Sequence, residues 1–155
     1  ILLAFQQDRG NFATQFRMCQ REKGKTDNVW AIADGSFLVI ECKNEVLETR
    51  EFIKKSEAGQ LGQSMEWFRF RYPASTAIPI LIHPSRKLAP DAEVVSGMRV
   101  LDKVKLESLK VKLREFGKQL GDPSVGSSPS EVASRLEHFG FRGQKFADTF
   151  TSGPR

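Results

Sequence analysis

The sequence predicts an α/β domain in which a mixed β-sheet, beginning as an antiparallel meander, is flanked by helices. Two runs of β-branched and aromatic residues, 28–33 and 37–42, surround an Asp34-Gly35 pair, the strongest short-range signal of a β-hairpin. A later apolar run at 78–82 is typical of a buried strand, and two long segments carry apolar residues at helical spacing. Strands alternating with such helices indicate a sheet covered by helices.

The length and charge of the chain favour a single domain that binds an anionic partner. At 155 residues the chain suits one domain that buries about 68–70% of its unfolded surface. It carries 24 Lys and Arg against 19 Asp and Glu, and the net charge of +5 favours an anionic partner. We expect nucleic acid and no membrane, because no apolar run approaches the roughly 18 residues of a spanning helix.

The cysteine and histidine content argues against a disulfide-stabilised fold and against a zinc site. The chain has only Cys19, Cys42 and two His residues, which indicate neither a disulfide framework nor a zinc site. We therefore expect a reducing intracellular compartment, the cytoplasm.

The first elements lead into the hairpin. Residues 1–8 form a helix-like apolar segment, and residues 15–21 alternate as a strand does. A turn at 22–25 then joins this strand to the hairpin, so that the three strands make an antiparallel meander.

The second strand of the hairpin ends in charged residues. Because side chains alternate along a strand, Glu41 and Lys43 share a face, about 6–7 Å apart. Leu38, Ile40 and Cys42 point to the other face.

The register of the hairpin decides whether Asp27 joins this pair. A two-residue turn sets Asp27 opposite Cys42, on the face away from Glu41. A three-residue loop (Asp34 to Ser36), or one bulge, sets Asp27 opposite Lys43 and beside Glu41. A shared site therefore requires one odd residue in the hairpin.

An aspartate followed fourteen positions later by Glu-x-Lys at the end of an apolar strand resembles the motif of the PD-(D/E)XK nuclease superfamily. The Pro that often leads this motif is absent, since Thr26 precedes Asp27. The resemblance implies that Asp27 and Glu41 ligate Mg²⁺, or Mn²⁺ in its place, often with the backbone carbonyl of Cys42. It also implies that Lys43 contacts the scissile phosphate or the attacking water.

The same resemblance implies a fold and an activity. The fold is the restriction-endonuclease-like core: a three-stranded meander, a crossing helix and further strands. The activity is metal-dependent hydrolysis of phosphodiester bonds in DNA, within a larger defence, restriction or repair protein, and many relatives act as homodimers. The residue types suit it, because Mg²⁺ prefers oxygen ligands and polarises a phosphoryl oxygen, while a nearby Lys offsets the charge that develops.

Three alternatives to this activity stay open. The chain could be a non-cleaving nucleic-acid-binding domain of the same fold, or a nuclease directed at RNA. It could also be an unrelated α/β protein in which Glu-x-Lys is accidental.

A helix is expected after the hairpin, within residues 44–72. Its apolar residues recur at spacings of four, three and four: Leu61, Met65, Phe68 and Tyr72. Thr49 is a candidate N-cap. Gly59 and Gly62 each weaken the helix by roughly 1 kcal/mol relative to Ala, so we expect close packing there.

Gln60 and Leu61 on this helix resemble the Gln-Leu pair of the RecB-like nucleases, in which the Gln lies near the active site. Ser64 stands where those relatives carry an aromatic residue, so the resemblance transfers only to Gln60, as a positioning residue. An ordinary polar helix face is the alternative. Lys54 and Lys55, ahead of Gln60, are candidates for contacts to DNA phosphates.

The second half of the chain predicts two more strands and a long helix. His83 follows the strand at 78–82. It is either a general base or a polar residue that ends the strand. An edge strand follows at 98–101. Asp102 then caps a helix that Gly121 ends. Its apolar residues are Leu106, Leu109, Leu113, Phe116 and Leu120.

Basic residues are frequent on the helix between Asp102 and Gly121 and occur in the loop after His83. Its Lys-rich faces are either solvated or in contact with a nucleic-acid backbone, and such contacts weaken with salt. With Lys54 and Lys55, we expect Lys87 and Lys110 to meet DNA phosphates.

A Ser/Gly/Pro-rich stretch at 121–130 predicts a division of the chain. We expect a nuclease-like core at 1–121 and a small helical extension at 122–155. Ser128 and Glu131 form a capping box, with Pro129 at the first helical position.

Overall fold

The computed structural model describes residues 26–43 and 46–155, which form a mixed α/β fold, as predicted. The main sheet has the strand order β1-β2-β4-β6, with the bounds β1 (Asn28–Ala33), β2 (Ser36–Cys42), β4 (Thr76–Ile82) and β6 (Arg99–Leu101). β1 and β2 are antiparallel, whereas β2, β4 and β6 are parallel. The predicted helix at 1–8 and strand at 15–21 lie outside the described residues, so the three-stranded meander stays a prediction.

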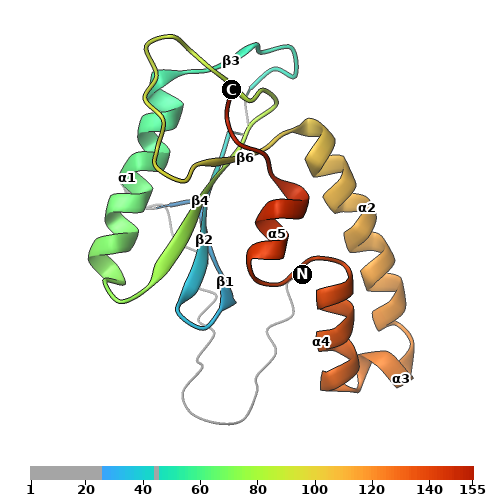
Figure 1. The fold of residues 1–155 in the computed structure, drawn as a ribbon. Helices are drawn as coiled ribbons and strands as arrows, with labels where there is room; N and C mark the ends of the chain where they lie inside the picture. The colour runs from blue at the N-terminus through green and yellow to red at the C-terminus, as the bar shows by residue number, and fades with distance from the viewer. Residues whose placement is uncertain (1–25, 44–45) are drawn as a thin grey trace.

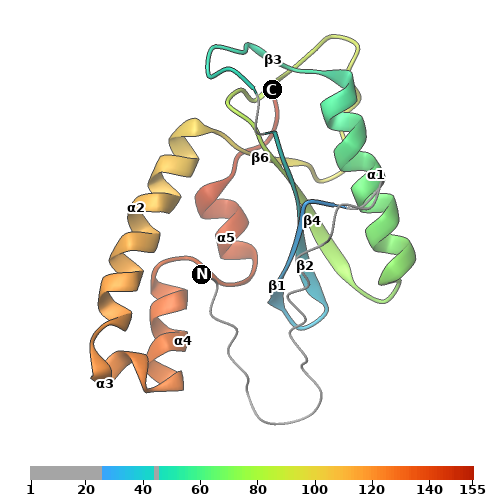
Figure 2. The same ribbon diagram turned by 180° about the vertical axis from the view of Figure 1, so that it is seen from behind.

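Helices cover both faces of this sheet (Figures 1 and 2). α1 (Lys55–Arg71) lies on one face and forms the crossover that parallel strands such as β2 and β4 require. α2 (Lys103–Leu120) and α5 (Gly143–Phe150) lie on the other face. The remaining elements are α3 (Pro123–Gly126) and α4 (Pro129–His138), beside α2, and β3 (Phe52–Ile53) paired with β5 (Lys87–Leu88).

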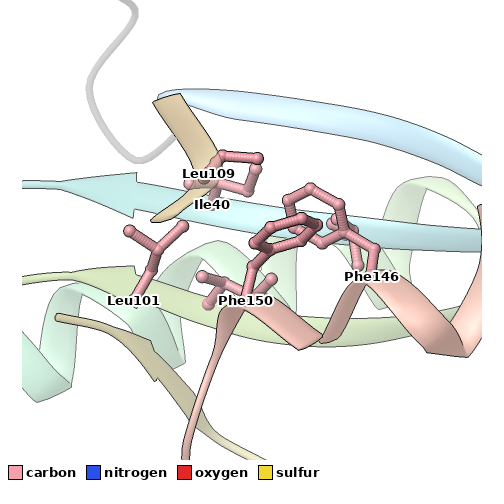
Figure 3. Close-up of a cluster of buried hydrophobic side chains, with 7 residues drawn as sticks. Ile40, Leu101, Leu109, Phe146 and Phe150 are labelled. Atoms are coloured by element: carbon pink, nitrogen blue, oxygen red, sulfur yellow. The ribbon is translucent and has the colours of Figure 1, made fainter. Parts of the chain in front are cut away.

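The core has two layers because alternate side chains of β2 point to opposite faces. One buried cluster, between the sheet and the helices α2 and α5, consists of Leu38, Ile40, Ile80, Leu101, Leu109, Phe146 and Phe150 (Figure 3). On the other face, Val39 packs against Met65 and Phe68 of α1. Glu41 follows two positions after Val39, so its side chain belongs to the α1 face.

The hairpin combines a two-residue turn with a bulge. Asp34-Gly35 forms the turn, and Gly35 has a φ of 62°, in the left-handed region that glycine tolerates best. Ala33 pairs with Ser36 across this turn, but the pairing then skips Ile32, which is therefore the extra residue of a β-bulge.

The bulge supplies the odd residue that the site requires, although it shifts the register in the other direction from the expected one. Asn28 pairs with Ile40, so one position further along Asp27 lies opposite Glu41. The expected partner was Lys43. Both registers put Asp27 on the same face as Glu41, because they differ by two positions.

α1 lies within the predicted range of 44–72, but its N-cap is Lys54 and not the candidate Thr49. The chain is first extended through Phe52 and Ile53, which pair with β5, and the helix then starts at Lys55. The backbone N–H of Lys54 donates to the carboxylate of Glu57 at 2.7 Å, which fixes the first turn.

The helices α2 and α4 begin at the predicted caps. Asp102 accepts a hydrogen bond of 3.0 Å from the backbone N–H of Lys105, and Ser128 caps α4. Phe146 and Phe150 of α5 belong to the cluster under the sheet, so the residues after 121 contribute to the main core. The predicted division at residue 121 stays a prediction.

None of the helices in the described part of the chain combines the length and the hydropathy needed to cross a bilayer.

Candidate active site

A polar hollow of about 240 Å³ opens between the carboxyl end of β2 and α1. It is lined by Asp27, Glu41, Cys42, Lys43, Gln60, Gln63 and Ser64. The structure therefore brings together all five residues that the sequence analysis assigned to the site, from the hairpin and from the helix that follows it. We call this the carboxylate hollow.

Asp27 is positioned by the residue before it and by the hairpin register. The hydroxyl of buried Thr26 lies 3.0 Å from the carbonyl oxygen of Ile40 and 3.1 Å from that of Asn28, which fixes the start of β1 against β2. Asp27 Oδ2 accepts a hydrogen bond of 2.8 Å from the backbone N–H of Cys42. Its carboxylate is thereby held at the end of β2.

Glu41 is the buried acid of the hollow, with an exposed fraction of 6%. Its Oε1 accepts a hydrogen bond from the hydroxyl of Ser64 on α1. Burial raises the pKa of Glu41 above its ordinary value and the negative charge of Asp27 raises it further, while the Ser64 hydrogen bond and the Lys43 charge oppose this. The hollow is therefore short of positive charge.

Lys43 supplies the one cationic side chain among the residues that line the carboxylate hollow. Its Nζ lies 3.8 Å from Glu41 Oε2 and donates a hydrogen bond to the amide oxygen of Gln60. Gln60 thus holds the ammonium from the helix side while Glu41 attracts it from the strand side. This contact is consistent with the positioning role predicted for Gln60.

Cys42 contributes its backbone to the hollow. Its side chain packs with the cluster on the opposite face of the sheet. Burial raises the pKa of the Cys42 thiol to about 11, with further contributions from the charges of Asp27 and Glu41, so the thiol stays protonated at neutral pH. Because the N–H and C=O of a strand residue point to the same edge, its carbonyl faces the side of Asp27.

The donor atoms of the hollow fit a hard divalent cation. Two carboxylates, a backbone carbonyl and the amide of Gln63 offer oxygen atoms, and Mg²⁺ is usually bound by one or two carboxylates together with water and substrate phosphate. In residues 26–43 and 46–155, no cluster of three or more His, Cys, Asp and Glu side chains is placed to hold a metal. The residues present therefore fit Mg²⁺ or Mn²⁺ completed by substrate oxygens.

His83 does not line the carboxylate hollow. It is buried at the end of β4, where its Nδ1 lies 3.0 Å from the backbone N of Ser85 and 2.9 Å from its carbonyl oxygen. Its Nε2 lies 3.6 Å from Glu57 Oε2, on a side chain that also pairs with Arg50. The structure thus favours the polar strand end over the general base.

The four lysines predicted to meet phosphates are spread over the molecule. Lys54 and Lys55 stand at the start of α1, and Lys55 lines a groove between that helix and residues 93–96. Lys87 lies in β5, and Lys110 pairs with Glu107 on the outer face of α2. They do not form one surface.

The sequence predicted no role in the site for Gln63 and Ser64, which line the hollow, or for Thr26, which fixes the strand beside it. Ser64 lies four positions after Gln60, so helical geometry alone puts both on one face. That spacing could have identified Ser64, whereas the contact of Thr26 with Ile40 depends on the hairpin register.

Comparisons of the chain with protein-family models, with curated proteins and with solved structures gave no match. The class that the fold and the site define is an α/β protein with a polar, two-carboxylate hollow at a strand end. Its function has to be argued from that hollow.

Proposed function

We propose that the chain is a Mg²⁺-dependent nuclease domain with a restriction-endonuclease-like core, which hydrolyses phosphodiester bonds in DNA. The observation that carries the proposal is the convergence of Asp27, Glu41 and Lys43 in one open hollow, in the order of the PD-(D/E)XK motif. The net charge of +5 agrees with a polyanionic substrate.

In this proposal each residue has a separate task. Asp27, Glu41 and the Cys42 carbonyl hold the cation, which when bound polarises a phosphoryl oxygen and acidifies a water molecule. Lys43, steadied by Gln60, donates a hydrogen bond to the scissile phosphate or the attacking water and offsets the charge that develops there. Ser64 holds the Glu41 carboxylate in place.

Other nucleophiles are unsuited to this hollow. The Cys42 thiol is protonated at neutral pH, since its pKa is raised to about 11. His83 is buried away from the hollow and bonded to Ser85. Attack by water, with positioning and charge stabilisation supplied by the side chains, is the chemistry that these residues suit best.

The experiment is a cleavage assay on plasmid DNA, single-stranded DNA and RNA with Mg²⁺, Mn²⁺ or EDTA. Wild-type protein is expected to cut DNA with either metal and to stop in EDTA. Asp27→Asn and Glu41→Gln should each reduce the rate to that of the EDTA control, because each removes a cation ligand. Metal-induced thermal stabilisation should disappear in the same two variants.

Two exposed acids away from the hollow provide matched controls. Asp91→Asn and Glu115→Gln make the same chemical changes and should cut DNA as the wild type does. Equal, unmeasurable cleavage by the wild type and both site variants would favour a non-cleaving nucleic-acid-binding domain. Metal-dependent cleavage of RNA alone would change the substrate class.

A further inference from the structure

A second hollow, of about 260 Å³, lies beyond the carboxyl ends of β4 and β6, and four of its eight lining residues are cationic. The cations come from three separate segments of the chain: Arg86 and Lys87, Lys103, and Arg155. Backbone hydrogen bonds hold two of these segments together, since the N–H of Arg155 donates to the carbonyl of Arg86 at 2.8 Å. Asp102 is the acidic residue among the described lining residues, and it pairs with Arg86. We call this the basic hollow.

Two acidic residues of the loop after β2 neutralise part of the basic hollow. Glu51 lies 2.8 Å from Lys87 Nζ, and Glu48 pairs with Lys103. The side chains are 56% and 60% exposed in the first pair and 57% and 73% exposed in the second. Ion pairs this exposed contribute little to stability and are screened by salt, so another anion can replace the two glutamates.

Each hollow is lined by residues at the carboxyl ends of the parallel strands, and these strand ends lie at the upper edge of the sheet in Figure 1. The N–H of Lys43 donates to the carbonyl of Ile82, and the N–H of His83 donates to that of Leu101, so the ends of β2, β4 and β6 are neighbours. Adjacent strands are about 4.8 Å apart, which separates the ends of β2 and β6 by about 10 Å. One strand of a duplex carries a phosphate about every 3.4 Å along the axis, so about three nucleotides span that distance.

We propose that the basic hollow binds backbone phosphates of the same nucleic-acid strand whose scissile bond lies in the carboxylate hollow. Glu48 and Glu51 occupy the phosphate positions until the strand binds. This inference rests on the proposed function for the site next to it. A nucleic acid fits better than a single small anion, because the four cations come from three segments of the chain and the backbone presents charges at a regular spacing.

The test measures binding without cleavage, by fluorescence anisotropy of a labelled duplex DNA in EDTA over a salt series. Lys87→Ala/Lys103→Ala is expected to weaken binding and to reduce the slope of log K against log salt by about 1.8, since each phosphate contact contributes about 0.9. Glu48→Gln/Glu51→Gln is expected to tighten binding by about 2- to 30-fold, because two exposed ion pairs no longer compete.

Double variants of equal charge elsewhere on the surface control for net charge. Lys118→Ala/Lys145→Ala and Glu115→Gln/Glu137→Gln alter exposed residues outside the basic hollow. If these shift binding as much as the hollow variants do, the basic hollow is not a phosphate surface and the inference fails. Displacement of the DNA by polyglutamate at equal charge concentration would also overturn it, in favour of an acidic protein partner.

Cleavage separates this inference from the proposed function. If Lys87→Ala/Lys103→Ala cuts and binds DNA like the wild type, the basic hollow does not bind phosphates, and the nuclease proposal is unaffected. A wild-type protein that binds DNA through the basic hollow but cuts nothing with Mg²⁺ would overturn the nuclease proposal and support the binding surface.

Discussion

Among single residues, Glu41 is the one whose charged form is unfavourable for stability and yet is needed for the proposed chemistry. It is nearly inaccessible to solvent and lies beside a second carboxylate, and its pKa stays above the ordinary value despite Ser64 and Lys43. A buried carboxylate with this perturbation, in an open hollow, is typical of functional sites. A divalent cation would supply the positive charge that the protein's own side chains leave short.

Glu41→Gln is expected to stabilise the metal-free protein at neutral pH. The raised pKa means that folding favours the protonated acid, so this contribution to stability is present below the ordinary pKa and is lost as the pH rises through the folded value. Urea unfolding in EDTA, from about pH 4, near the ordinary pKa of Glu, up to neutral pH, should show the two proteins equally stable at low pH and the variant more stable at neutral pH.

Addition of Mg²⁺ should reverse this order, because the cation stabilises only the protein that retains its ligand. Asp91→Asn, which alters an exposed acid, should track the wild type throughout. A wild-type protein more stable than Glu41→Gln in EDTA at neutral pH would contradict the charge shortage inferred for the hollow.

The residues of the site that lie on one hairpin could be predicted, whereas those from other elements mostly could not. Asp27, Glu41 and Lys43 follow from the spacing of a motif over two adjacent strands. Ser64 shares a helix face with Gln60, which the spacing of four residues indicates, but its hydrogen bond to Glu41 depends on the rotation of α1 about its own axis, set by packing against β2 and β4. That rotation is set by residues far apart in the sequence.

Among the elements, the hairpin was predicted in its turn and its strands, but the bulge was one of two alternatives. A two-residue Asp-Gly turn matches the twist of antiparallel strands. The hairpin therefore has this turn, and the extra residue, Ile32, forms a bulge within β1. The bulged Ile32 still packs against the cluster under α5. The sequence alone does not weigh this packing against the alternative of a longer loop.

Two glycines provide a paired test of backbone conformation. Gly35→Ala should destabilise the protein by about 1–2 kcal/mol, because the residue has a φ of 62° in a left-handed turn. Gly59→Ala should stabilise it by about 0.8–1.0 kcal/mol, because the position is helical and a Cβ there meets no atom of the described residues within 4 Å. Chemical denaturation of both variants measures the two effects.

The two helical glycines also correct the expectation of close packing. Gly62 is approached by Val95, whose side chain would lie 3.7 Å from an added Cβ, whereas Gly59 faces open space. Gly59→Ala therefore measures the helix propensity of the position more directly than Gly62→Ala does, because an added Cβ at Gly59 meets no neighbour among the described residues. A loss of stability in this variant would indicate that the helix surface at Gly59 is not open in solution.

For the whole molecule, the sequence predicted the class of fold better than the relation between its parts. The apolar spacing along α2 is regular, yet Leu109 and Phe116 are buried while Leu113 is 48% exposed. A helical repeat identifies an apolar stripe but does not say which part of it a neighbour covers. In the same way, the sequence predicted a helical extension at 122–155 but not that Phe146 and Phe150 in it pack against the sheet.

Those partners make α5 a structural part of the molecule. Phe150 is fully buried and belongs to the same cluster as Leu38 and Ile40 of β2 (Figure 3), the strand that ends in Glu41. Beyond α5, Ser152 forms a bridge with Val100 of β6. We therefore expect the C-terminal residues to unfold together with the sheet and not as a separate unit.

Phe150→Ala tests this coupling. The cavity left in the cluster should cost about 3–5 kcal/mol of the free energy of unfolding, in a single transition that also removes the carboxylate hollow. Phe70→Ala removes the same side chain from a position that is 88% exposed and should change stability by no more than about 0.5 kcal/mol. Two separate transitions, or a loss for Phe150→Ala as small as that for Phe70→Ala, would instead make residues 122–155 an independent extension.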